Sequence, residues 1–345
     1  MYQYTDFDKQ FVKLRAQQFR DQLERWQKGE LSDEQMLPLR LQNGWYIQRY
    51  APMARIAVPY GEISSLQLRT LGHIAREYDR PSPELLASAQ ATQDALEASQ
   101  PGATLAAPAL QYGYGHFTTR TNCQFNWIPI TRAADVMDLL ASVSMHGIQT
   151  SGNDIRNITC DAWEGIAEDG IVDCRPFAEI TRQWSSLHPE FSYLPRKFKI
   201  AFNGAEEDRA AIGWYDIGLQ ALKNDAGEVG FRVLVGGGMG RTPIVGSVVR
   251  EFLPWAELLN YIEAIVRVYN GYGRRDNKWK ARIKILVKSE GQGFIDAVDK
   301  EYRDIVELDG APHTITQAEL DRVASHFVVP ELKPANLQAK VDPQG

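Results

Sequence analysis

The amino-acid sequence predicts an α+β fold, because helical and strand-like patterns both recur along it. Phe19, Leu23 and Trp26 follow one another at i, i+4 and i+7, which is the spacing of one helix face. Residues 45–59 instead alternate between core-facing and outward-facing positions, as a half-buried strand does. The order strand, helix, insertion, strand, helix over residues 43–148 describes one compact unit of mixed structure.

Length and composition indicate a soluble globular protein. At about 150 residues per domain, 345 residues correspond to roughly two domains. The 38 basic and 44 acidic residues give a net charge of -6, which argues against broad binding to nucleic acid or to an anionic membrane. The amino terminus is polar and acidic, unlike a signal peptide, and no apolar run approaches the ~18 residues of a membrane span. We therefore expect a cytoplasmic protein with neither nucleic acid nor membrane as a partner.

The three cysteines, Cys123, Cys160 and Cys174, give no sign of a disulfide framework or a metal site. Their number is odd and no two of them form a CxxC pair. A protein-only iron–sulfur cluster would be one thiolate short of the usual four. None of the six histidines has metal-ligand spacing with another.

The first part of the chain, residues 1–42, is predicted to be helical. Residues 5–28 form an amphipathic pattern that stops at Gly29. Ser32 and Gln35 then have the spacing of a capping box, which predicts a second short helix.

Residues 43–148 form the first predicted α+β unit. Its expected elements are a strand at 45–59, a helix at 65–78, a surface insertion at 81–111 with one loose helix over 84–99, a strand at 116–130 and a helix with Thr131 as its N-cap.

Residues 149–310 form the second, less regular unit, and residues 311–345 look like a linker that contains one short helix. The expected elements here are strands at 196–202, 230–235 and 281–288, and helices at 255–270 and 316–326.

Two strands carry polar faces that suit an anion-binding cavity. Along 196–202 the apolar Phe198 alternates with Lys197 and Lys199, so both lysines share the face opposite the core. Along 116–130 one face carries Arg120 followed by three amides, and an arginine among amides is suited to an oxyanion. A lysine-guarded edge strand and a solvated sheet face are the plain alternatives.

Three further segments contain residues that could bind an anionic ligand or a cofactor. The polar loop at 149–157 places Arg156 in a turn. The glycine run 236–240 follows an apolar strand, but it does not match the dinucleotide-binding motif GxGxxG, because Arg241 occupies the last glycine position. Two interpretations of the run are left: a tight turn, or a backbone that approaches a flat or anionic ligand closely. Residues 273–284 are strongly basic within an acidic chain, which fits either a solvated face or contact with a polyanionic cofactor.

Taken together, several stretches resemble the sirohaem-dependent nitrite and sulfite reductases. They are YGHFTTRTNCQFNWIPI, QTSGNDIRNITC, YLPRKFKIAFNG and FRVLVGGGMGR in this order, with GRRDNKWKARIK behind them. The similarity is greatest to the bacterial sulfite reductase haemoprotein branch, and it covers about residues 40–290. It implies a ferredoxin-like half-domain at 43–148 followed by the first lobe of the sirohaem domain at 149–310.

The resemblance implies a six-electron reduction of sulfite to sulfide in sulfate assimilation, or of nitrite to ammonia on the same scaffold. Its cofactors are sirohaem and a [4Fe–4S] cluster, and its electron donor is ferredoxin or an NADPH-dependent flavoprotein. Matching the family motifs residue by residue gives four cations around the substrate: Arg120, Arg156, Lys197 and Lys199. Candidates for contacts with the carboxylate-rich macrocycle are Asn153, Arg196, Gly236, Gly237, Gly238, Arg241, Arg275 and Arg282.

The sequence departs from the family in its cysteines. Family members carry four cluster cysteines as CxxxxxC … CxxxC in a second, pseudo-symmetric half, and the three cysteines here match none of them. We therefore expect residues 311–345 to lead toward a missing second half that binds the cluster. Three readings follow: the amino-terminal portion of a reductase, a non-catalytic sirohaem-binding half that needs a partner chain for the cluster, or an inactive fragment.

Overall fold

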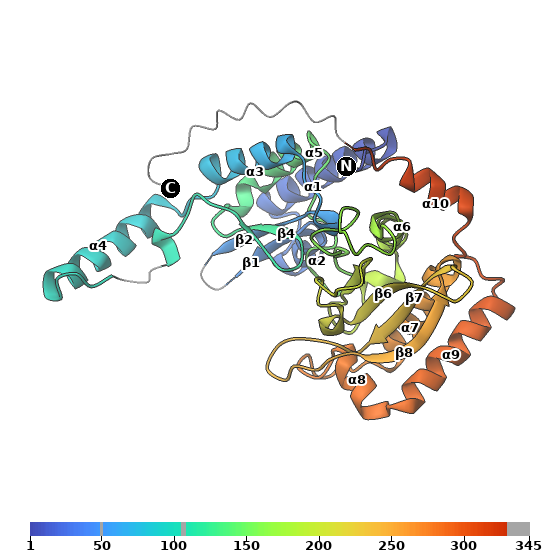
Figure 1. Ribbon diagram of the computed structural model, residues 1–345. Helices are drawn as coiled ribbons and strands as arrows, with labels where there is room; N and C mark the ends of the chain where they lie inside the picture. Colours follow the sequence, from blue (N-terminus) through green and yellow to red (C-terminus); the bar gives the residue numbers. More distant parts are fainter. Residues whose placement is uncertain (49–50, 105–107, 330–345) are drawn as a thin grey trace.

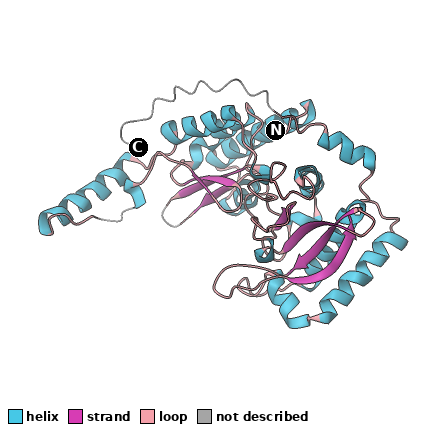
Figure 2. Ribbon diagram, in the orientation of Figure 1, coloured by secondary structure: helices cyan, strands magenta, loops and turns pink. Residues whose placement is uncertain are grey.

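The computed structural model describes residues 1–48, 51–104 and 108–329 (Figure 1). Its elements form an α+β protein with two four-stranded sheets (Figure 2). The helices are α1 (Asp6–Gln27), α2 (Asp33–Gln42), α3 (Ser65–Glu77), α4 (Pro83–Ser99), α5 (Ala133–Ala141), α6 (Arg175–Ser185), α7 (Leu258–Tyr272), α8 (Ile283–Glu290), α9 (Gln292–Glu307) and α10 (Gln317–Ala324). The strands are β1 (Trp45–Ile47), β2 (Pro52–Ala57), β3 (His116–Phe117), β4 (Asn122–Phe125), β5 (Ile200–Asn203), β6 (Ile217–Lys223), β7 (Val229–Val235) and β8 (Ser247–Pro254).

The first sheet has the order β1-β2-β4-β3 and is antiparallel throughout. Helices α1, α3 and α5 lie against one of its faces (Figure 1). Phe19 from α1, Phe125 from β4 and Val136 from α5 have no exposed surface and meet in this core. Burial of these apolar faces is the main stabilising contribution in this half.

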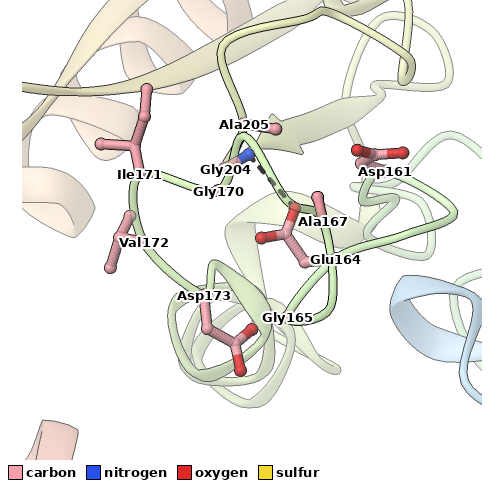
Figure 3. A pocket seen from close by; sticks show the side chains of 10 residues that line it. All are labelled: Asp161, Glu164, Gly165, Ala167, Gly170, Ile171, Val172, Asp173, Gly204 and Ala205. Carbon is pink, nitrogen blue, oxygen red and sulfur yellow. Dashed lines mark hydrogen bonds between the residues drawn. The ribbon is translucent and has the colours of Figure 1, made fainter.

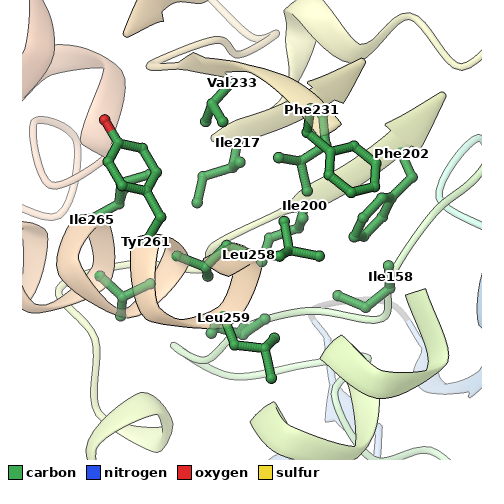
Figure 4. Packing of buried hydrophobic residues seen from close by; sticks show 14 of the residues in the cluster. Ile158, Ile200, Phe202, Ile217, Phe231, Val233, Leu258, Leu259, Tyr261 and Ile265 are labelled. Carbon is green, nitrogen blue, oxygen red and sulfur yellow. The ribbon is translucent and has the colours of Figure 1, made fainter. Parts of the chain in front are cut away.

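The second sheet has the order β5-β6-β7-β8, with β5 parallel to β6 and the other pairs antiparallel. Helix α7 packs its apolar face on this sheet, as Figure 4 shows for Leu258 and Ile265 opposite Ile217 and Phe231. Because both the sheet face and the helix face are apolar, this layer forms a hydrophobic core beneath β5, which begins directly after Lys199.

Helix α4 projects away from the rest of the molecule (Figure 1) and has no buried residues. Its bounds agree with the loose helix expected within the 81–111 insertion. Within the described residues, no helix combines the length and the apolar character needed to cross a bilayer.

Capping boxes begin the first two helices, and the second of them is the predicted one. Thr5 caps α1, and the Ser32 side chain accepts from the N–H of Gln35 at the start of α2. The prediction of Thr131 as the N-cap of α5 is wrong: Thr131 lies inside a short 3₁₀ turn, and Arg132 precedes the helix with no side-chain cap.

Four predicted strands differ from the structure. Residues 45–59 contain two antiparallel strands, β1 and β2, in place of one. Residues 283–290 are helical. Ile283 and Val287 lie one helical turn apart and both pack inward. The alternation of basic and apolar residues here was therefore mistaken for the pattern of a strand. The 116–130 strand is instead a hairpin of β3 and β4. Its turn breaks the alternation, so Phe117 is 53% exposed whereas Cys123 and Phe125 are buried. Of 196–202, only the end belongs to the sheet, while Phe198 forms a single bridge with Ile155.

Residues 311–329 do not form a linker. Helix α10 packs on α6, and Val323 is fully buried. The chain then pairs with its own amino terminus, since Tyr2 forms a bridge with Phe327 and their rings lie 5.2 Å apart. The remainder of the expected linker, 330–345, lies outside the described residues.

Candidate functional site

A cavity of about 1100 Å³ opens between the two halves of the molecule. Its volume lies at the upper end of the ~300–1,000 Å³ of small-molecule sites. Four segments line most of it: 58–63 after β2, 117–121 at the hairpin turn, 159–166, and 209–215 before β6. Arg175, Lys199 and Met239 complete the lining.

Three non-glycine residues with positive φ line this cavity. Tyr60, Thr121 and Ala211 all line it, and their φ angles are 45°, 50° and 55°. A residue with a β-carbon adopts this left-handed region only at a cost, and such residues cluster at ligand sites. Tyr60 is also buried, so packing holds it in this conformation.

Arg120 is held at the hairpin turn by two hydrogen bonds to the second half. Its Nη1 donates to Thr159 Oγ1 and its Nη2 to the carbonyl of Asn157, both at 2.6 Å. Its guanidinium carbon lies 4.8 Å from the centre of the Tyr215 ring. Burial lowers the pKa of this arginine, which indicates a charge with little access to water.

The two lysines lie on the side of their strand opposite the core, as predicted. Phe198, Ile200 and Phe202 have no exposed surface, whereas both lysines are partly accessible. Burial lowers the pKa of Lys197 to about 8, and the neighbouring Arg156 adds to this effect. Burial also lowers the pKa of Lys199 to about 8; Asp216 opposes the shift, while nearby cations add to it.

Arg156 lies beside Lys197 and is fixed by its own loop. Its guanidinium donates to the carbonyls of Thr150 at 2.9 Å and Gly152 at 2.6 Å and pairs with Asp154 at 2.9 Å. Burial outweighs that ion pair and raises the pKa of Asp154 to about 7.

The structure brings the four predicted substrate cations into one group. The charge of Arg156 affects the pKa values of Lys197 and Arg120, and the charges of Lys197 and Arg120 affect that of Lys199. Of the four, Arg120 and Lys199 line the cavity itself. Such a concentration of positive charge with depressed pKa values is a common mark of a functional site.

At the glycine run 236–238 the backbone passes very close to the backbone of residues 213–215. A β-carbon at Gly237 would lie 2.2 Å from the carbonyl oxygen of Gly213 and 2.5 Å from that of Tyr215, and Gly236 has a φ of 86°. The buried Lys284 holds the loop by donating to the carbonyls of Gly238, Met239 and Thr242.

The remaining predicted cofactor contacts lie outside the cavity lining. Arg282 is committed to a bidentate pair with the buried Asp216. Arg275 is exposed and donates to the carbonyl of Tyr193 and to the side chain of Asn270. The other three have varied exposure and do not line the cavity: Arg196 is partly exposed, and Asn153 and Arg241 are exposed.

Sequence reasoning missed several residues of the site. Arg55 on β2 donates to Gln124 and to the carbonyl of Thr150, and its charge lowers the pKa of Lys197. Tyr215 lies beneath two of the cations. Arg55 alternates with core residues along 45–59, which was a usable signal, whereas the sequence around Tyr215 offered none.

Two more cations line the cavity, but carboxylates neutralise them. Arg175 pairs with Glu62 and Asp173 at 2.8 Å each. Arg209 pairs with Asp161 and Asp169.

A smaller pocket of about 190 Å³ beside the cavity is acidic (Figure 3). The Glu164 carboxylate accepts from the N–H groups of Cys174 at 2.8 Å and Gly204 at 3.2 Å, so it braces these two backbones. Burial raises the pKa of Glu164 to about 7. Over the described ranges, no group of three or more potential ligands could hold a metal ion.

The residues present fit sirohaem and not the cluster. The cavity combines a large volume with the unpaired cations Arg120 and Lys199, which suits a flat ligand bearing carboxylates together with an oxyanion. All three cysteines are buried, and burial raises each thiol pKa above its usual value, the opposite of what a thiolate ligand needs.

The fold and site therefore define an α+β protein with a cationic cavity. Residues 151–304 match the family described as the nitrite and sulphite reductase 4Fe-4S domain. Together with the curated relatives described below, this match shows that the chain is similar to the sirohaem-dependent nitrite and sulfite reductases, a family of oxidoreductases.

Two curated relatives illustrate the relationship. The chain is 25% identical over 277 residues to "Sulfite reductase [ferredoxin] 1" of Mycolicibacterium paratuberculosis, covering 79% of this chain and 44% of the relative. It is 29% identical over 269 residues to the "Assimilatory ferredoxin-dependent nitrite reductase" of Haloferax mediterranei, covering 76% and 42%. The chain thus spans about two fifths of the length of these relatives.

The fold is also similar to a solved structure, that of the NirA protein of Mycobacterium tuberculosis. The TM-score is 0.63 at 22% sequence identity, and the match covers 79% of this chain and 48% of that one.

Proposed function

We propose that this chain forms the sirohaem-binding and anion-binding part of a cytoplasmic enzyme that reduces sulfite to sulfide in six electron transfers. The observation that carries the proposal is the pairing of Arg120 with Lys199 in one cavity, beside Lys197 and Arg156. Within the described part of the chain, Arg120, Lys197 and Lys199 form no ion pair with a carboxylate, so their charges are available to an anion.

The cations would act in two ways. Arg120 presents a planar donor whose position is fixed by Thr159 and Asn157, which suits the oxygens of an oxyanion. The lysines, whose pKa values lie near 8, release protons more readily than an ordinary lysine, so they can supply protons as oxygen leaves as water. When bound, sirohaem would supply the iron that binds the anion and passes electrons to it. Arg196, Arg241, Arg275, Asn153 and the run Gly236, Gly237 and Gly238 remain proposed contacts of the macrocycle.

Nitrite is the second candidate substrate, because one of the two relatives described above is named as a nitrite reductase. The proposed electron donor is ferredoxin, or alternatively a flavoprotein that uses NADPH. The [4Fe–4S] cluster would be held by another part of the polypeptide or by a partner chain. A non-catalytic sirohaem-binding half is the alternative role.

The test is to purify, from its native cells, the whole polypeptide that contains this sequence. Sirohaem content would be read from the absorption spectrum, and sulfite and nitrite turnover would be measured separately with reduced methyl viologen. We expect stoichiometric sirohaem and faster turnover of sulfite. Faster turnover of nitrite would reassign the substrate, sirohaem without turnover would leave the binding role, and absence of sirohaem would overturn the proposal.

A further inference from the structure

The ring of Tyr215 lies next to two of the cavity cations. The guanidinium carbon of Arg120 is 4.8 Å from the ring centre, and Nζ of Lys199 is 6.0 Å from it. Both distances are within the range of a cation–π interaction. Tyr215 itself is 7% exposed and lines the cavity between a short 3₁₀ turn and β6.

The position of these two cations creates an electrostatic problem. Arg120 and Lys199 both lose hydration on burial. The charge of Arg120 disfavours that of Lys199, and the charge of Arg156 disfavours that of Arg120. The carboxylate that faces Lys199 is Asp216, which already binds Arg282. The other charges acting on Lys199 are positive: Arg282 and Lys197.

An aromatic ring stabilises neighbouring cations in a different way from a carboxylate. The face of the ring carries negative potential, so it stabilises a nearby cation. It has no net charge, however, so it does not repel an anion that enters the cavity. A carboxylate at the same place would neutralise the cations and repel the anion, as the acids do at Arg175 and Arg209.

We infer that Tyr215 is a positioning residue whose ring keeps Arg120 and Lys199 charged and side by side at the cavity, so that both face one oxyanion. The inference rests on the proposed function, because it assigns the two cations to the anion. The backbone of Tyr215 supports this role, since its carbonyl lies against Gly237 and its N–H donates to Ile212 at 3.1 Å. The backbone that carries the ring is thereby held in place.

The test compares Tyr215→Phe, which keeps the ring, with Tyr215→Leu and Tyr215→Met, which remove it. The full 345-residue chain without cofactor would be used, with a thermal unfolding transition to establish that each variant is folded. The pKa of Lys199 would be followed by NMR of isotope-labelled lysine, assigned with Lys199→Arg. Sulfate affinity at pH 7 would be measured by calorimetry.

Loss of the ring should lower the pKa of Lys199 by about 0.5 to 1 unit and weaken sulfate binding about three- to tenfold. Tyr215→Phe should stay within about twofold of the unmodified chain. The inference is overturned if both ring-free variants behave like the unmodified chain, or if Tyr215→Phe falls as far as Tyr215→Leu, which would assign the effect to the hydroxyl. If Tyr215→Leu does not fold, Tyr215→Met decides. Neither readout depends on turnover, so a failed reduction assay with intact ring effects would reject the proposed function alone.

Discussion

Arg282 and Asp216 form a bidentate ion pair next to the backbone of Lys199. Nη2 of Arg282 lies 2.7 Å from Oδ1 and 2.9 Å from Oδ2 of Asp216, which is fully buried. The same carboxylate accepts from the N–H of Lys199 at 2.9 Å, and the Asp216 carbonyl accepts from the N–H of Gly236. The pair thus links three segments: the backbone at Lys199, the turn at Gly236 and the start of α8 at Arg282.

Removing the Asp216 charge should destabilise the protein strongly. In Asp216→Asn, Arg282 would keep a largely buried positive charge without its partner, and breaking such a pair costs about 3 kcal/mol or more. The free energy of unfolding would be measured in urea. The control is Glu251→Gln, which breaks the exposed Arg232–Glu251 pair and should cost less than about 1 kcal/mol. Equal losses in the two variants would contradict this account of the buried pair.

Anion affinity should fall as the pH rises through about 8. Lys197 and Lys199 each have a pKa near 8, so both are mostly protonated below that value and neutral above it. Sulfate is a suitable probe because it does not titrate in this range, and its dissociation constant would be measured by calorimetry from pH 6.5 to 9.5. In Lys199→Met the dependence should become shallower. An affinity that stays constant up to pH 9.5 would show that neither lysine faces the anion.

Replacing Lys197 or Lys199 by Met should depress sulfite turnover far more than sirohaem content. The lysines lie among the cations assigned to the anion, and methionine keeps a similar length without the charge or the proton. A loss of about 100-fold in kcat is expected for removal of a general acid. Turnover and sirohaem absorption would be measured on the whole native polypeptide. Unchanged turnover would show that Lys197 and Lys199 do not contact the substrate. The control is Lys288→Met, which replaces an exposed lysine.

A methyl group at position 237 should disturb the crossing beneath the cavity. In Gly237→Ala the new β-carbon would meet two backbone oxygens at 2.2 and 2.5 Å, and backbone atoms cannot swing aside as a side chain can. We expect a loss of about 1–3 kcal/mol in unfolding free energy, the usual cost of overpacking. Gly271→Ala is the matched control, because it faces open space near the end of α7 and should be neutral or stabilising. Similar melting temperatures for the two variants would be inconsistent with the close crossing.

Local patterns predicted the elements that depend on local physics. The Ser32–Gln35 capping box and the periodic face from Phe19 to Trp26 needed only neighbouring residues, and both helices form where expected. The pattern failed where an alternation had two interpretations, as at 283–290, or where an unpredicted turn reversed the chain, as between β3 and β4. At 283–290 a packing partner, Gly236 beside Val287, lies far away in the sequence. The turn between β3 and β4 is local, since His116 pairs with Gln124.

The sequence by itself determined the α+β class, the starts of the first two helices, the resemblance to the family through its motifs, and the placement of Lys197 and Lys199 on the side opposite the buried Phe198. Only the tertiary structure decided that Arg120 and Lys199 share one cavity, that Arg282 is occupied by Asp216, and that Tyr215 lies beside both cavity cations. The physical reason is that helix caps and strand faces depend on residues a few positions apart. The charge, burial and pKa of a side chain depend instead on groups that folding brings together from 39 to more than 90 positions away, as with Arg120 and its contacts to Thr159 and Tyr215.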